Sequence, residues 1–196
     1  MNSSPSHKIG LYFGSFNPIH IGHLAIANYM LEFTDLERIW FVVSPHNPLK
    51  EKKSLLADSH RLEMVHLALY DDYKMRPTDI EFRLEQPSYT IDTLAFISEK
   101  YPNHEFVVLM GGDSMENLHK WKNYQILLDQ YKIYVYARPQ AKYHKNQHQN
   151  IQVFHAPQMD ISASFIRKSI KEGKSMKYFL PPKVWDYVES MHFYKK

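Results

Sequence analysis

The sequence predicts a doubly wound α/β fold, in which a mostly parallel sheet carries helices on both of its faces. Two observations lead to this prediction: short apolar runs alternate with segments of helical periodicity, and no internal repeat interrupts that order. In such a sheet, ligands bind beyond the carboxyl ends of the strands, near the point where the strand order reverses. Chemistry is therefore expected in the loops after Phe13, Val43, Met110 and His155.

In the first half of the chain, each expected element is marked by its apolar pattern and by the residues at its ends. Gly14 ends the first apolar run, and Ser44-Pro45 gives a turn after the second. Asp58 or Ser59 can cap the start of a helix. The pattern predicts strands over 8–13 and 38–43, helices over 22–33, 58–69 and 88–99, and a short strand with a turn over 75–83.

The second half of the chain continues the alternation. Gly111-Gly112 follows a strongly apolar run, Gly173 is a natural helix stop, and Pro181-Pro182 opens the last helix. Residues 138–150 are polar and lack periodicity, which predicts an exposed, mobile loop. Strands are expected over 105–110, 131–137 and 151–155, and helices from Ser162 or Ser164 to about 172 and over 183–191.

Composition predicts a single globular domain over residues 1–196. Hydrophobic residues make up 44% and charged residues 23%, and no apolar run is long enough to cross a membrane. The first residues lack the apolar stretch of a signal peptide, so a cytoplasmic location is expected. The absence of cysteine excludes disulfides, thiolate nucleophiles and Cys-based zinc sites. A net charge of only +3 argues against a nucleic-acid-coating protein and is compatible with small anionic substrates.

The densest motif, GSFNPIHIGHL, follows the first expected strand at residues 14–24. Gly14 lets a ligand approach the backbone, and Asn17-Pro18 forms a turn. His20 and His23 then lie three residues apart at a helix start, where Gly22 keeps the turn open. Imidazole and backbone N–H donors that point the same way beside a helix N-terminus form an anion site.

The His pair is open to two other interpretations. The pair could be incidental, or it could be half of a metal site, although no further ligands follow at a zinc-like spacing. Its place after a buried strand and at a helix start favours function. The segment resembles the phosphate-binding signature of the nucleotidyltransferase superfamily, G-x-F-[DN]-P-x-H-x-G-H. It also matches the HIGH motif of class I aminoacyl-tRNA synthetases, but a synthetase needs a longer chain and a KMSKS loop, which Lys174-Ser175-Met176-Lys177 is not.

A second motif, ISASFIR at residues 161–167, resembles the superfamily's I-S-S-T-x-I-R. Helix N–H groups, serine hydroxyls and a guanidinium can together hold a polyphosphate. Taken alone, the segment could be an ordinary serine N-cap with a surface arginine. Its pairing with the first motif favours phosphate binding.

The resemblance implies a Rossmann-like core in which an acceptor phosphate attacks the α-phosphorus of ATP in line, without a covalent enzyme intermediate. It implies that His20, His23 and Arg167 are catalytic. Mg²⁺ would accompany ATP, bound mainly by phosphate oxygens and water, so no dedicated protein ligands are expected. The further ATP contacts that it implies are Gly14, Ser15, Phe16, Gly22, Gly111, Asp113, Ile161, Ser162 and Ser164.

Three motifs in the middle of the chain resemble the bacterial nicotinate-nucleotide adenylyltransferases. These are the proline-bracketed run from Pro45 to Lys50, the segment PSYTIDTL from Pro87, and GGDS followed by Leu118 and Trp121. The resemblance implies that Thr90 lies near a nicotinate carboxylate and that Trp121 stacks on the pyridine ring, although by spacing alone Trp121 would be core packing. It implies acceptor contacts from His46, Lys50, Arg61, Ser88, Tyr89, Thr90 and Trp121.

Three other functions are less compatible with the sequence. Pantetheine-phosphate adenylyltransferases share the fold and the first motif, but their chains are usually shorter, and the Pro45–Lys50 and Trp121 features argue against this family. Cytidylyltransferases carry a different, arginine-rich signature. A non-catalytic nucleotide sensor is disfavoured because His20, His23, Lys50 and Arg167 are all present. We expect ATP and nicotinate mononucleotide as partners, with no nucleic acid and no membrane, and a homo-oligomer is compatible with the sequence.

Overall fold

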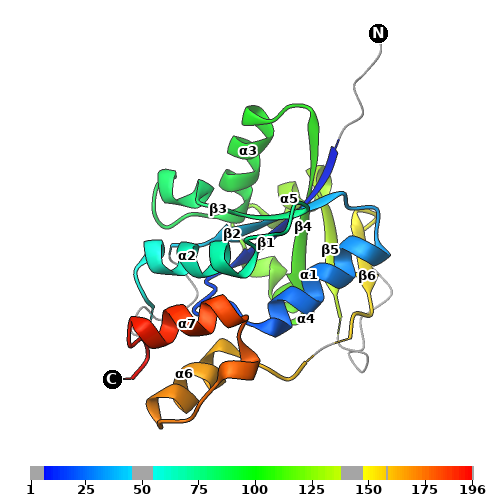
Figure 1. Cartoon of the computed structure of the whole chain (residues 1–196). Coiled ribbons are helices and arrows are strands. Elements are labelled where there is room, and N and C mark those ends of the chain that lie inside the picture. Colours follow the sequence, from blue (N-terminus) through cyan, green and yellow to red (C-terminus); the bar gives the residue numbers. More distant parts are fainter. Residues whose placement is uncertain (1–6, 46–54, 138–147, 158, 196) are drawn as a thin grey trace.

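The computed structural model describes residues 7–45, 55–137, 148–157 and 159–195 (Figure 1). Within these residues, six strands form one sheet in the order β3-β2-β1-β4-β5-β6, and every neighbouring pair is parallel. The predicted α/β class with a parallel sheet is confirmed. The strands are β1 (His7–Gly14), β2 (Arg38–Val43), β3 (Met75–Thr78), β4 (His104–Gly111), β5 (Lys132–Tyr136) and β6 (Ile151–Phe154).

Helices cover both faces of the sheet (Figure 1). One apolar cluster packs α1 (Ile21–Phe33), α2 (Asp58–Ala68), α6 (Ala163–Lys171) and α7 (Pro182–Ser190) on one side. A second cluster packs α3 (Thr90–Lys100) and α5 (Tyr124–Gln130) on the other. Neighbouring strand residues alternate between the two clusters, and this explains why the strands are continuous apolar runs.

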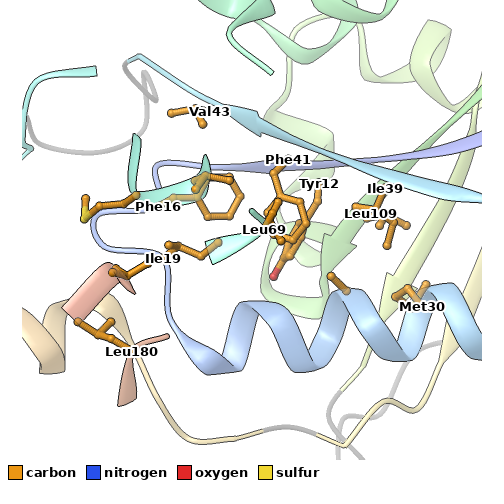
Figure 2. Packing of buried hydrophobic residues seen from close by; sticks show 14 of the residues in the cluster. Tyr12, Phe16, Ile19, Met30, Ile39, Phe41, Val43, Leu69, Leu109 and Leu180 are labelled. Atoms are coloured by element: carbon orange, nitrogen blue, oxygen red, sulfur yellow. The ribbon is translucent and has the colours of Figure 1, made fainter. Parts of the chain in front are cut away.

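Aromatic rings fill the first cluster directly beneath the end of β1 (Figure 2). Tyr12, Phe16 and Phe41 have ring centroids 5.3–5.8 Å apart, and all three side chains are buried. Ring pairs tilted in this way are favoured by the charge distribution of aromatic faces and edges. The turn after β1 therefore packs against a group of closely packed, buried aromatic rings.

The predicted helices and strands are confirmed, with end shifts of one or two residues, except in the segment after β4. No periodic pattern predicts a helix there, and the structure contains α4 (Gly112–Glu116), the 3-10 turn η3 (Leu118–Lys120) and α5. Further 3-10 turns are η2 (Ile80–Arg83) and η4 (Lys177–Phe179). The predicted loop covers residues 138–150. Residues 138–147 lie outside the described residues, and residues 148–150 form a turn before β6.

The prediction of a single domain over the whole chain stays a prediction. In the part of the chain that the structure describes, no helix is long and apolar enough to cross a membrane.

Candidate active site

The carboxyl ends of the parallel strands meet at one edge of the sheet, where the candidate site residues gather. The strand order reverses at β1, which pairs with β2 on one side and β4 on the other. Such a switch point opens a crevice for a ligand. Gly14 ends β1 and Gly111 ends β4, so the two glycine-marked turns predicted to bind ATP flank this point.

The turn after β1 is shaped by Phe16 rather than by an open space beside Gly14. A Cβ on Gly14 would lie 2.8 Å from the Phe16 ring, so glycine is required for this ring to pack under the strand end. Phe16 itself has a positive φ of 44° and is 1% exposed. The Phe16 ring thus fills the place beside Gly14 that a Cβ would take, and with its side chain buried Phe16 can offer a nucleotide only its main chain.

His20 and His23 lie together at the start of α1, with ring centroids 3.7 Å apart. A Cβ on Gly22 would lie 3.1 Å from His20 Nδ1, so glycine allows the His20 ring to lie across the helix start. The main-chain N–H of His20 donates to His23 Nδ1 over 3.2 Å. A neutral His23 therefore carries its proton on Nε2, as a hydrogen-bond donor.

Burial makes His20 a neutral imidazole. Its side chain is 6% exposed, and loss of solvent lowers its pKa to about 4. Its Nδ1 has no hydrogen-bond partner among the described residues. A neutral imidazole keeps one N–H donor, which can hydrogen-bond a phosphate oxygen without adding a formal charge.

Arg167 connects α6 to the turn that carries the His pair. Its Nη1 donates to the Asn17 main-chain oxygen over 2.8 Å, and its Nη2 donates to Ser164 Oγ over 3.2 Å. Ser162 caps α6 by accepting from the Phe165 N–H over 3.1 Å. The second motif is therefore held against the first by the contact from Arg167 to Asn17.

Other predicted ATP contacts line the same edge. The Ser15 carbonyl belongs to the turn after β1, and the Ile161 Cβ lies 3.9 Å from the position of a Cβ on Gly22. Asp113 is exposed in the first turn of α4, and its charge contributes to the raised pKa of Tyr136, for which burial is the larger cause. Gly111, Asp113 and Ile161 thus surround the switch point.

The predicted acceptor contacts form a second group, where α3 begins. Tyr89 is the N-cap of α3, and its side chain makes no capping hydrogen bond to the first turn, which Thr90 opens. The Ser88 hydroxyl is buried beside the Glu81 carboxyl group, whose pKa it lowers. Trp121 and Tyr89 are both partly buried at the rim of the second apolar cluster, so Trp121 combines core packing with an accessible surface. An uncapped helix start suits an anionic group.

Arg61, expected to touch the acceptor, is instead a fully buried connector. Its guanidinium is 0% exposed, and all five of its N–H donors bond to protein atoms. It has no donor left for a substrate in this arrangement. The acceptors are the main-chain oxygens of Leu56, Ser15, Ser44 and Pro45, at 2.6–3.1 Å, and the Asp58 carboxylate at 2.6 Å.

Two predicted acceptor contacts, His46 and Lys50, lie outside the described residues. Within the described residues, no group of three or more His, Asp or Glu side chains is placed to hold a metal ion.

Glu81 is a buried carboxyl group that sequence reasoning missed. It is 3% exposed and accepts a hydrogen bond of 2.9 Å from the Thr93 hydroxyl in α3. Burial raises its pKa, while the nearby hydroxyls of Ser44, Thr93 and Ser88 lower it by a smaller amount. No ion pair to Glu81 occurs within the described ranges. It therefore sits, without a compensating cation, beside the start of α3.

The raised pKa of Glu81 predicts how the free energy of unfolding depends on pH. Between its ordinary value of 4.5 and its raised folded value, the native protein binds more protons than the unfolded chain, so stability falls as pH rises through that window. Glu81→Gln cannot ionise and keeps an acceptor for Thr93. We expect it to be roughly 0.5–1 kcal/mol more stable at about pH 7, with the gain vanishing below about pH 4.5. Urea unfolding at both pH values measures this, and destabilisation at neutral pH would contradict it.

Comparison with known proteins identifies the family. The model of the cytidylyltransferase-like family matches residues 11–169. A probable nicotinate-nucleotide adenylyltransferase from Flavobacterium johnsoniae is 56% identical over 193 residues, which cover 96% of this chain and 100% of the relative. The chain belongs to the nicotinate-nucleotide adenylyltransferase family. A further family member of the same name, from Christiangramia forsetii, is 50% identical and covers 97% of this chain and 100% of the relative.

Solved structures agree on the fold of this family. A nicotinic acid mononucleotide adenylyltransferase from Plasmodium falciparum, complexed with NaAD, superposes with a TM-score of 0.81 at 22% identity and covers 96% of this chain and 98% of that chain. A nicotinate-nucleotide adenylyltransferase described as putative, from Vibrio parahaemolyticus, gives a TM-score of 0.73 at 16% identity over 97% of this chain and 96% of that chain. The Rossmann-like α/β architecture is thus shared by proteins of very different sequence.

Proposed function

We propose that this protein transfers the AMP unit of ATP to nicotinate mononucleotide, giving nicotinate adenine dinucleotide and pyrophosphate in NAD biosynthesis. The observation that carries the proposal is the cluster of His20, His23 and Arg167, joined at the turn after β1 in a member of this family. A phosphate oxygen of the acceptor forms a bond to the α-phosphorus. The bond from that phosphorus to the bridging oxygen breaks, and pyrophosphate leaves with the electron pair.

The three side chains supply different kinds of stabilisation in this proposal. His20 and His23 are N–H donors for α- and β-phosphate oxygens, and His20 does so as a neutral group because of its lowered pKa. Arg167 adds a permanent positive charge for the departing pyrophosphate. Donors that are held in place before the reaction stabilise developing charge without reorganisation. Catalysis then rests on position and electrostatics, with no covalent intermediate.

Mg²⁺ is proposed to bind together with ATP. The donor set at the switch point consists of imidazole and guanidinium N–H groups, which suit phosphate oxygens rather than a hard cation. Phosphate oxygens and water would hold the ion, with Asp113 as the exposed carboxylate of this edge. When bound, Mg²⁺ would neutralise phosphate charge.

The acceptor is proposed to bind between α3 and Trp121. The uncapped first turn at Thr90 and the buried Ser88 hydroxyl suit the nicotinate carboxylate, and the indole of Trp121 suits a flat pyridine ring. His46 and Lys50 are proposed to reach the acceptor phosphate. We also propose that the reaction takes place in the cytoplasm, where ATP is abundant.

Trp121→Ala is expected to raise KM for nicotinate mononucleotide by about ten-fold while KM for ATP changes less than about two-fold. The reason is that the indole would contact only the pyridine ring. Steady-state kinetics with each substrate varied in turn measures the split. Trp185→Ala is a matched control, because Trp185 packs in α7 on the opposite face of the sheet. An equal rise in both KM values would count against Trp121 as the ring platform.

Pyrophosphate release tests the proposed function directly. The purified protein is given Mg²⁺-ATP with nicotinate mononucleotide, nicotinamide mononucleotide or phosphopantetheine. Release with nicotinate mononucleotide alone supports the proposal. Release only with another acceptor would overturn the acceptor assignment, and ATP binding without release would favour the sensor function.

A further inference from the structure

The last residues of the described chain return to the active-site edge. After α7 ends at Ser190, His192 and Tyr194 both adopt positive φ angles, of 54° and 64°. This region is unfavourable for residues with a Cβ and persists where tertiary contacts hold it. Phe193 supplies one such contact, with its ring 4.9 Å from His60 of α2. The chain end is thereby folded back onto the molecule.

The hydroxyl of Tyr194 reaches a residue of the first motif. It donates to Asn17 Oδ1 over 2.8 Å, across 177 positions of sequence. Asn17 is 1% exposed, and the same Oδ1 accepts the Leu56 N–H over 3.3 Å. Its main-chain oxygen accepts from Arg167. Asn17 therefore joins the chain end, the segment before α2 and the catalytic arginine.

The electrostatics around Tyr194 agree with this placement. Burial raises its pKa far above the ordinary value, and the positive charges of Arg167 and Arg61 oppose that rise because both guanidinium groups are near. The hydroxyl therefore stays protonated and remains a donor at physiological pH. Asn17 in turn lies three residues before His20, so its side-chain contacts bear on the whole turn.

We propose that Tyr194 is a positioning residue of the adenylyl-transfer site: through Asn17, its hydroxyl fixes the turn that leads to His20 and that accepts a hydrogen bond from Arg167 of α6. The inference rests on the proposed function, since it concerns the same site. The segment that contains Tyr194 then helps to hold the active site in place, although Tyr194 itself touches no reacting atom. A merely structural role, in which Tyr194 only fastens the chain end, gives different results in the following tests.

Tyr194→Phe removes the donor and keeps the ring. Because one partly buried hydrogen bond is lost, we expect calorimetry to show about ten-fold weaker binding of a non-hydrolysable ATP analogue. KM for nicotinate mononucleotide should stay within about two-fold. A loosened fold would lower the active fraction and hence the apparent kcat, but it would leave the affinity of the remaining molecules unchanged. Weaker nucleotide binding therefore separates positioning from structure.

Tyr187→Phe is the matched control. The Tyr187 hydroxyl bonds to His60 Nδ1 over 2.8 Å in the same part of the molecule, and within the described residues it does not contact Asn17. We expect its nucleotide affinity to equal that of the unsubstituted protein. Equal affinity in Tyr194→Phe and Tyr187→Phe would overturn the inference. Because the analogue needs no turnover, this outcome is distinguishable from a failure of pyrophosphate release.

A double-mutant cycle tests whether the effect passes through Asn17. Asn17→Ala removes the acceptor, so adding Tyr194→Phe to it should change nucleotide affinity by less than about two-fold. In the Asn17→Asp background the acceptor is kept, and Tyr194→Phe should still cost about ten-fold. If Tyr194→Phe still weakened nucleotide binding about ten-fold in the Asn17→Ala background, Tyr194 would act by another route. That result would overturn the inference.

Discussion

His23→Ala is expected to lower kcat by about three orders of magnitude while the fold persists. His23 is partly buried and its Nδ1 already accepts the His20 N–H, so its Nε2 proton is the donor assigned to a phosphate oxygen. Removal of one fixed donor to a developing negative charge costs about 10²–10³ in kcat. His23 also packs 3.7 Å from the His20 ring, and its loss would release that ring too. The expected effect is therefore at the upper end of this range.

Pyrophosphate release at saturating substrates measures the loss in kcat, and thermal unfolding verifies the fold. His23→Gln is an informative companion, because its amide N–H₂ lies near the place of Nε2 and should recover part of the rate. His66→Ala, an exposed histidine on α2, should behave as the unsubstituted protein. Near-normal kcat in a well-folded His23→Ala would remove His23 from the proposed mechanism.

The fold could be predicted because its strands are buried on both faces. Such strands read as continuous apolar runs, and β2 was predicted with the bounds that the structure has. The segment Tyr124–Gln130 escaped prediction because α5 has only seven residues, of which Leu127 alone is buried. Its start depends on Asn123 with a φ of 51°, a tertiary feature without a sequence pattern.

The candidate site could be predicted only where its residues are close in sequence. His20, Gly22 and His23 form a local motif, and their shared helix start follows from spacing. The contacts from Arg61 to Ser15 and from Tyr194 to Asn17 span 46 and 177 positions, and no local pattern marks them. Glu81 was missed because a charged residue between Ile80 and Phe82 looks like any surface position until its burial is seen.

Arg61→Met is expected to destabilise the protein by about 3–5 kcal/mol. Methionine fills part of the volume but offers no donor. The main-chain oxygens of Leu56, Ser15, Ser44 and Pro45 would then lose their partner beneath the active-site edge. Each buried acceptor left unpaired costs about 1–3 kcal/mol, partly offset where water enters. A loss of this size is a large fraction of the stability of an ordinary domain.

Urea unfolding of Arg61→Met against Arg83→Met separates the two roles considered for Arg61. Arg83 is 66% exposed and, within the described residues, forms an ion pair only with Asp79, so its loss should change stability by less than about 1 kcal/mol. Arg61→Lys keeps the charge but cannot reproduce five donors in one plane, so it should fall between the two. If Arg61 instead contacted the acceptor, Arg61→Met would stay close to normal stability and raise KM for nicotinate mononucleotide alone. The two outcomes exclude each other because a guanidinium whose five donors all bond to the turns after β1 and β2 and to the start of α2 has none to give to a substrate.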